Sequence, residues 1–117
     1  MSNNAVLDKS KTFAVSIVNL WKNTKNDVKS TLFHQLLRSG TSIGANVYEA
    51  QHAQSKNDFI SKMNIALKEA YETEYWLDLL LATDYLHAPQ ADNLLSECRE
   101  LRFLLISIIR SSKNEKQ

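Results

Sequence analysis

Residues 38–77 read RSGTSIGANVYEAQHAQSKNDFISKMNIALKEAYETEYWL, and this stretch decides the fold. Apolar residues recur every three to four positions on both sides of a short polar break near Gln54, which is the spacing of one face of an α-helix. Ser55, followed three residues later by Asp58, is typical of a helix start. The stretch therefore predicts two long helices that fold back on each other.

Two further helices flank this stretch, because the same apolar spacing continues on both sides of it. Asp27 is placed to cap the second helix, and Pro89 fits the first turn of the fourth. Short connections between long helices favour antiparallel neighbours, so the sequence predicts an all-α protein, an antiparallel up-down-up-down four-helix bundle. We expect one domain, residues 1–117, with helices at about residues 8–22, 28–53, 56–86 and 89–111.

Composition agrees with one helical domain. The 117 residues include only two glycines and one proline, too little turn chemistry for a many-stranded sheet. The single cysteine, Cys98, has no disulfide partner within the chain, and the first residues lack the pattern of a signal peptide. The longest apolar run, residues 103–109, is shorter than the roughly 20 residues of a membrane span. We therefore expect a cytoplasmic protein that does not cross a membrane.

Two segments are more apolar than a bundle helix requires. Residues 75–81 read YWLDLLL and residues 103–109 read FLLISII, which spreads large apolar side chains around each helix. A monomer would expose part of this surface, and contiguous exposed apolar patches mark interfaces. The alternative is that the ends of the bundle bury all of these side chains. We expect a homo-oligomer with an interface that includes Trp76, Leu79, Phe103, Leu104 and Ile106.

Small residues on the second helix indicate close helix packing. Gly40 and Gly44 lie one turn apart, and each costs about 1 kcal/mol relative to alanine, so a steric demand must outweigh that loss. The alternative is that they let a ligand approach the backbone. Polar residues near the same apolar seam predict structural ion pairs rather than catalysis. These residues are Arg38, Asn46, Glu49, Glu69 and Glu72.

These motifs also carry a family resemblance. The chain resembles the 23S rRNA intervening-sequence proteins, also called the four-helix-bundle protein family, over about residues 12–109. The motifs that match are residues 38–46, Glu49-Ala50, residues 55–59 and residues 65–77. Such proteins are similar to the accessory protein of diversity-generating retroelements, a five-fold barrel of four-helix bundles that binds nucleic acid and a reverse transcriptase. The resemblance thus implies a pentameric ring. The family name refers to spacers of ribosomal RNA genes and implies no biochemical activity.

The sequence gives little support for a metal centre or an enzyme. Glu49-x-x-His52 has the spacing of a di-iron helix ligand pair, and folding back at the break places Asp58 of the third helix opposite Glu49. The imperfect second motif, Asp84-x-x-His87, lies about 26 residues beyond Asp58, or roughly 39 Å along the helix, so the two motifs cannot share a site within one subunit. Cys98 lies on an apolar seam and is expected to be a small buried residue. Nucleophile elbows, phosphate-binding glycine loops and zinc clusters are missing from the sequence. We expect no catalytic residues, no cofactor and no metal.

Charge is divided unevenly along the chain. Residues 1–48 hold six basic and two acidic side chains, whereas residues 49–100 hold four basic and ten acidic ones. The favoured interpretation is a non-enzymatic oligomeric scaffold or adaptor that binds a protein partner through exposed aromatics such as Tyr71 or Tyr75. The alternative is a nucleic-acid-binding accessory protein, because the basic segments offer contacts to phosphates. Its candidate contacts are Lys22, Lys25, Lys29 and Arg38.

Overall fold

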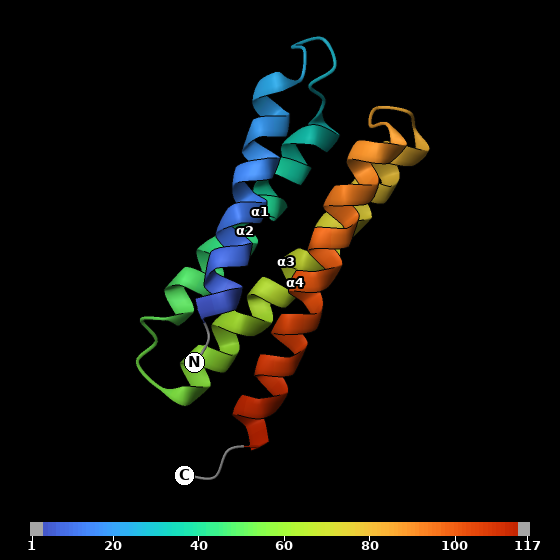
Figure 1. The fold of residues 1–117 in the computed structure, drawn as a ribbon. Coiled ribbons are helices and arrows are strands. Elements are labelled where there is room, and N and C mark those ends of the chain that lie inside the picture. Colours follow the sequence, from blue (N-terminus) through green and yellow to red (C-terminus); the bar gives the residue numbers. More distant parts are fainter. Residues whose placement is uncertain (1–3, 115–117) are drawn as a thin grey trace.

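The computed structural model describes residues 4–114, which form four α-helices packed against one another (Figure 1). Helix α1 spans Asn4–Asn23, α2 spans Thr31–Ala50, α3 spans Lys56–Ala82 and α4 spans Ala88–Asn114. Within these residues the structure contains no strand, which confirms the all-α prediction. Residues 1–3 and 115–117 of the predicted domain lie outside the described part of the chain.

The helices form a rod of 53 × 21 × 20 Å. Consecutive helices pack on each other, and α1 also meets α4, although this is the least extensive of the four contacts. The connections at residues 24–30 and 83–87 lie at one end of the rod, and the α2–α3 connection lies at the other end, together with the start of α1 and the end of α4 (Figure 1). None of the described helices is long and apolar enough to span a membrane.

Several helix ends differ from the prediction: α1 begins at Asn4 rather than near residue 8, α2 covers residues 31–50 rather than 28–53, and α4 ends at Asn114 rather than near residue 111. Two of the differences have a clear local cause. The N-cap of α2 is Ser30 rather than Asp27, because the Ser30 side chain accepts the hydrogen bond from the Phe33 amide. Helix α3 ends at Ala82 rather than near residue 86. There the amide of Tyr85 donates to the carbonyl of Leu80 (2.9 Å), while Asp84 takes a φ of 65°. This left-handed turn stops the helix and redirects the chain into α4.

The start of α3 follows the prediction. Ser55 caps the helix by accepting a hydrogen bond from the Asp58 amide (3.0 Å). The Asp58 carboxylate in turn accepts one from the Gln54 amide (3.2 Å), so the side chain and the backbone support each other across the α2–α3 connection.

The core is formed by apolar residues that recur at helical spacing along each helix. It includes Leu36, Ile43 and Val47 of α2, Met63, Ala70 and Leu77 of α3, and Cys98, Leu101 and Leu105 of α4. The thiol of Cys98 donates to the Ala70 carbonyl (3.3 Å), and burial raises the pKa of this thiol to about 12. The cysteine therefore stays protonated at neutral pH and acts as a small core residue.

Gly40 and Gly44 lie where α2 packs closely against α1. A Cβ atom at Gly40 would come within 2.9 Å of Ile17 Cγ1, and one at Gly44 within 3.2 Å of the Ser10 carbonyl oxygen. Both distances are shorter than ordinary van der Waals contacts. The glycines thus set the separation of α1 and α2.

Candidate protein-interaction surface

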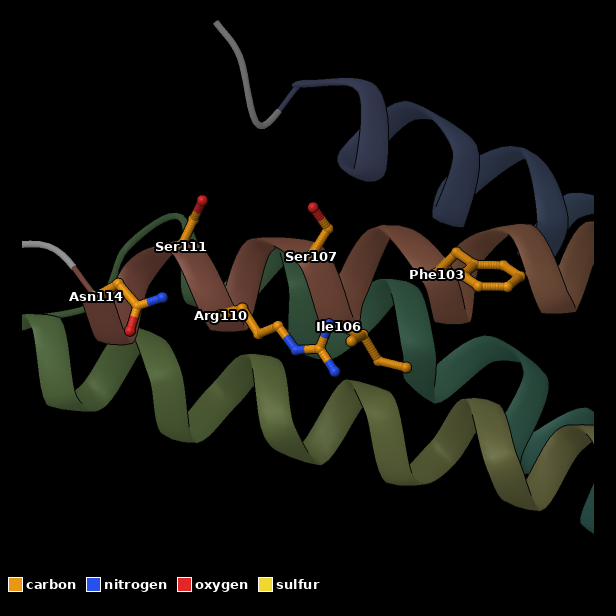
Figure 2. A pocket seen from close by; sticks show the side chains of 6 residues that line it. All are labelled: Phe103, Ile106, Ser107, Arg110, Ser111 and Asn114. Atoms are coloured by element: carbon orange, nitrogen blue, oxygen red, sulfur yellow. The ribbon is translucent and has the colours of Figure 1, made fainter.

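An exposed apolar surface on α4 is the main candidate site. Phe103 is 68% exposed, more than any other large apolar side chain that the structure describes. It lines a shallow hollow of about 470 Å³, shown in Figure 2. We call the lining residues the α4 face: Phe103, Ile106, Ser107, Arg110, Ser111 and Asn114.

Helical spacing places these residues on the outside. Leu101, Leu105 and Ile109 turn the opposite side of α4 into the core. Ser107 and Ser111 have short side chains, so the helix surface is hollowed between Phe103 and the end of α4. Figure 2 shows the Arg110 side chain extended along the helix toward Ile106. The face therefore combines a projecting ring, a depression and a cation.

Arg102 anchors the aromatic part of this surface. Its guanidinium lies 5.4 Å from the Tyr71 ring centroid and 5.6 Å from that of Phe103, both within cation–π range. Its Nε donates to Glu74 Oε1 (2.6 Å), and this hydrogen bond raises the pKa of Arg102. The second oxygen of Glu74 accepts from Arg99 Nε (3.2 Å). One carboxylate thus holds two arginines in place beside Phe103.

The α4 face keeps one cation without an ion-pair partner. Arg99 and Arg102 share Glu74, whereas Arg110 forms no salt bridge within residues 4–114. The face therefore combines two apolar side chains, Phe103 and Ile106, with one guanidinium and short polar side chains. Of these, the aromatic ring and the arginine are of the types enriched in protein interfaces.

The structure brings together three of the five predicted interface residues. Phe103 and Ile106 belong to the α4 face, and Leu104 adjoins Phe103 in a neighbouring hollow. Trp76 lies elsewhere: it is half-buried, and its indole Nε1 donates to Glu72 Oε2 (2.9 Å). Leu79 is also half-buried and lines neither hollow. Trp76 and Leu79 are therefore not part of the α4 face.

A second apolar surface was not predicted from the sequence. Helices α1 and α2 enclose an open groove of about 410 Å³. We call it the α1–α2 groove, and its lining residues are Leu7, Asp8, Lys11, Ala14, Thr41, Gly44, Ala45 and Tyr48. Tyr48 is 60% exposed, and nearby on α1 Val15 is 50% exposed. The sequence did hold a signal for this groove: the first helix has apolar residues outside its main seam, and the second helix carries the small residues Gly44 and Ala45.

The predicted nucleic-acid contacts fall into two separate places. Lys22 and Lys25 are exposed at the α1–α2 connection, and Lys29 lies over the Trp21 ring (4.7 Å to the centroid). Arg38 is farther along α2, where its guanidinium pairs with Glu69 Oε1 (3.2 Å) and with Glu72. The hydrogen bond that Arg38 donates to Glu72 raises the pKa of Arg38. Of these four residues, the three lysines form no salt bridge within residues 4–114, whereas Arg38 forms two.

The remaining predicted residues have local partners. Asn46 donates from Nδ2 to the Ser42 carbonyl of its own helix (2.9 Å). Glu49 pairs with Lys62 of α3 (3.0 Å), so it links α2 to α3. His52 is exposed, and its ring lies 5.2 Å from that of Tyr48. Among residues 4–114, His, Cys, Asp and Glu side chains form no group of three that could hold a metal ion.

Comparisons with known proteins find one family and one solved structure that resemble this chain. Residues 2–107 match the family of the 23S rRNA-intervening sequence protein. A crystal structure from Bacteroides thetaiotaomicron, described as a protein with unknown function from the S23 ribosomal protein family, superposes with a TM-score of 0.90 at 54% sequence identity. The match covers 94% of this chain and 99% of the other. No curated protein matches the sequence.

Proposed function

The chain belongs to the 23S rRNA-intervening sequence protein family, and we propose that it is a non-enzymatic cytoplasmic scaffold that assembles with itself and holds a protein partner. The family name states no activity, so the proposal depends on the surface of this chain. The α4 face supports it most directly.

The exposure of Phe103 is the observation that supports the proposal most strongly. Burying a phenylalanine side chain is worth about 1.5–3 kcal/mol, and in the single chain most of that gain is left unused. Tyr71 next to it is 50% exposed, and Arg102 holds both rings in place. Aromatic side chains and arginines are enriched among the residues that contribute most to binding between proteins.

The charge of the face favours protein over nucleic acid as its occupant. A nucleic-acid contact gains affinity by neutralising several phosphates with free cations. Glu74 pairs with Arg99 and Arg102 next to the face, and Arg110 is the one cation among the residues that line it. A single cation beside Phe103 and Ile106 is too few for a phosphate backbone and favours a protein partner.

Sedimentation velocity on the wild type and Phe103→Asp tests the proposal. We expect the wild type to sediment as an oligomer at micromolar concentration and Phe103→Asp to sediment as a monomer, because the substitution places a charge in the interface. Ile65→Asp is the matched control, since Ile65 is 40% exposed on α3 and lines neither surface. A wild type that stays monomeric, or a Phe103→Asp variant that assembles normally, contradicts the proposal.

A nucleic-acid-binding accessory role is the second candidate, and the lysines at the α1–α2 connection favour it. Replacing Lys22, Lys25 and Lys29 together with alanine should weaken binding to structured RNA or duplex DNA and flatten its salt dependence. Arg38→Ala is the control, because Arg38 is already paired with Glu69 and Glu72. Lack of binding by the wild type at low salt removes this candidate.

A further inference from the structure

One end of the rod carries aromatic rings and cations that lie outside both apolar surfaces. It is the end that holds the connections at residues 24–30 and 83–87 (Figure 1). There the Trp21 ring of α1 packs against the His34 ring from the first turn of α2, with centroids 4.6 Å apart and planes at 58°. The Lys29 Nζ lies 4.7 Å from the Trp21 centroid. We call Trp21, Lys22, Lys25, Lys29 and His34 the aromatic–lysine cluster.

Hydrogen bonds of the α1–α2 connection hold this cluster together. The Lys25 carbonyl accepts from the amides of Val28 (2.9 Å) and Lys29 (3.1 Å). The Thr24 amide donates to the Trp21 carbonyl (3.2 Å). These bonds fold residues 21–29 into tight turns, so the lysines emerge from a short segment next to the two rings.

The cations of the cluster are available for phosphate contacts. Lys22, Lys25 and Lys29 are the basic residues between positions 18 and 37, and Asp27 is the one acidic residue in that range. Lys22 and Lys25 are exposed, and none of the three lysines forms a salt bridge within residues 4–114. Neighbouring free cations bind a phosphate backbone with an affinity that falls as salt is added.

The rings distinguish this end from a surface that is only basic. Bases of a duplex are stacked inside it, whereas unpaired bases can stack on an aromatic side chain. His34 is exposed, and its ring rests on Trp21, which packs against the core. The pair therefore offers a stacking surface that is held in place from behind.

A second exposed ring lies at the same end. Tyr85 of the α3–α4 connection is 46% exposed. Its ring packs edge-on against Phe33, the residue before His34, with centroids 6.5 Å apart. Rings from both connections thus accompany the lysines, which is the combination found in proteins that bind single strands.

We propose that this end of the rod binds an unpaired nucleic-acid strand, with a base stacked on the His34–Trp21 pair and the flanking phosphates held by Lys22 and Lys25. The inference rests on the nucleic-acid candidate of the proposed function and names its ligand, an unpaired strand rather than a duplex. Every base has a flat face that can stack, so binding tolerates different sequences.

The fluorescence of Trp21 tests the stacking directly. The chain has two tryptophans, so Trp76→Phe leaves Trp21 as the only one. A single-stranded oligouridine or oligodeoxythymidine is expected to quench Trp21 emission at low salt and to bind about tenfold more tightly than a duplex of the same strand length. Binding of either oligomer supports the inference, and the tighter one identifies the preferred sugar.

Substitutions separate the ring from the charges. His34→Ala is expected to weaken binding of the oligomer about tenfold and to leave its salt dependence unchanged. Lys22→Ala combined with Lys25→Ala is expected to flatten the salt dependence. His52→Ala is the matched control, because His52 is also exposed and its ring packs near that of Tyr48 (5.2 Å), but at the opposite end of the rod.

The outcomes distinguish this inference from the proposed function. A duplex that binds as tightly as the oligomer, an unquenched Trp21 or normal binding by His34→Ala overturns the inference, while the nucleic-acid candidate stands. A wild type that binds neither ligand at low salt overturns both, and its molar mass still tests the scaffold separately. Far-UV circular dichroism shows whether each variant is folded.

Discussion

Gly40 shows how a single residue sets the distance between two helices. Alanine at this position gains about 1 kcal/mol of helix propensity, but its Cβ would lie 2.9 Å from Ile17 Cγ1 in the buried core. Overpacking typically costs 1–3 kcal/mol. Close packing of α1 on α2 therefore explains the glycine without any ligand.

Gly40→Ala is predicted to lower the free energy of unfolding by about 1 kcal/mol, because the clash outweighs the gain in helix propensity. Urea denaturation at a fixed protein concentration measures this change. Ser61→Ala, at an exposed position on α3, is the control and should change stability by less than about 0.5 kcal/mol. A more stable Gly40→Ala variant contradicts the packing explanation.

Asp84 carries the other residue-scale prediction. Its φ of 65° lies in the left-handed region, which costs a non-glycine residue roughly 1 kcal/mol. Asp84→Gly should therefore raise the free energy of unfolding by a few tenths to about 1 kcal/mol, and thermal denaturation measures the difference. Asp84→Val should be destabilising, because a β-branched side chain is strained there. Equal stability of all three proteins would show that the backbone strain is unimportant.

At the scale of the elements, a polar network joins α2 to α3. Thr73 Oγ1 lies 2.9 Å from Ser39 Oγ inside the core, and Arg38 pairs with Glu69 and Glu72 at the edge. The hydrogen bond from the Trp76 indole, together with Arg38, lowers the pKa of Glu72 below the ordinary value of 4.5. The network makes the α2–α3 contact sensitive to acid.

The sign of the acid effect follows from this lowered pKa. Below pH 4.5 the unfolded chain binds a proton at Glu72 before the folded chain does, so stability is lost as the pH falls through the folded pKa. We predict that Glu72→Gln reduces the loss of stability between pH 7 and the acid range, as measured by urea midpoints. Asp78→Asn, which also removes one negative charge, controls for net charge. A Glu72→Gln profile that parallels the wild type contradicts this assignment.

The elements also show what the sequence could predict. The number of helices and their core seams followed from the 3.6-residue period, because burial enforces that period along the whole helix. The start of α2 was missed because Asp27 and Ser30 are both good N-caps, and the choice depends on the path of the connection. The end of α3 depends on the left-handed Asp84, which no apolar pattern indicates.

The candidate surfaces were less predictable than the helices. Excess apolar residues on the fourth helix correctly indicated an exposed Phe103, but Trp76 looked equally apolar and is held by Glu72 instead. The α1–α2 groove requires the side chains of two helices at their packed distance, which the glycines set. Such a feature follows from the packing of two elements and not from the periodicity of one.

At the scale of the whole molecule, both candidate surfaces lie along the length of helices and not at the connections. The α4 face and the α1–α2 groove are both lateral, so a scaffold built from this chain would associate side by side. The lysines at the α1–α2 connection lie at one end of the rod and would remain accessible after such association. Self-assembly and nucleic-acid contact would thus use different parts of the surface.

The molar mass of the wild-type chain in solution tests self-assembly most directly. Light scattering across a salt series, with and without structured RNA and duplex DNA, is predicted to give a stable multiple of 13.4 kDa that persists in high salt, because apolar contacts of Phe103 are not screened. A mass of 13.4 kDa under all conditions, or a mass that rises only when nucleic acid is added at low salt, would contradict the proposed scaffold.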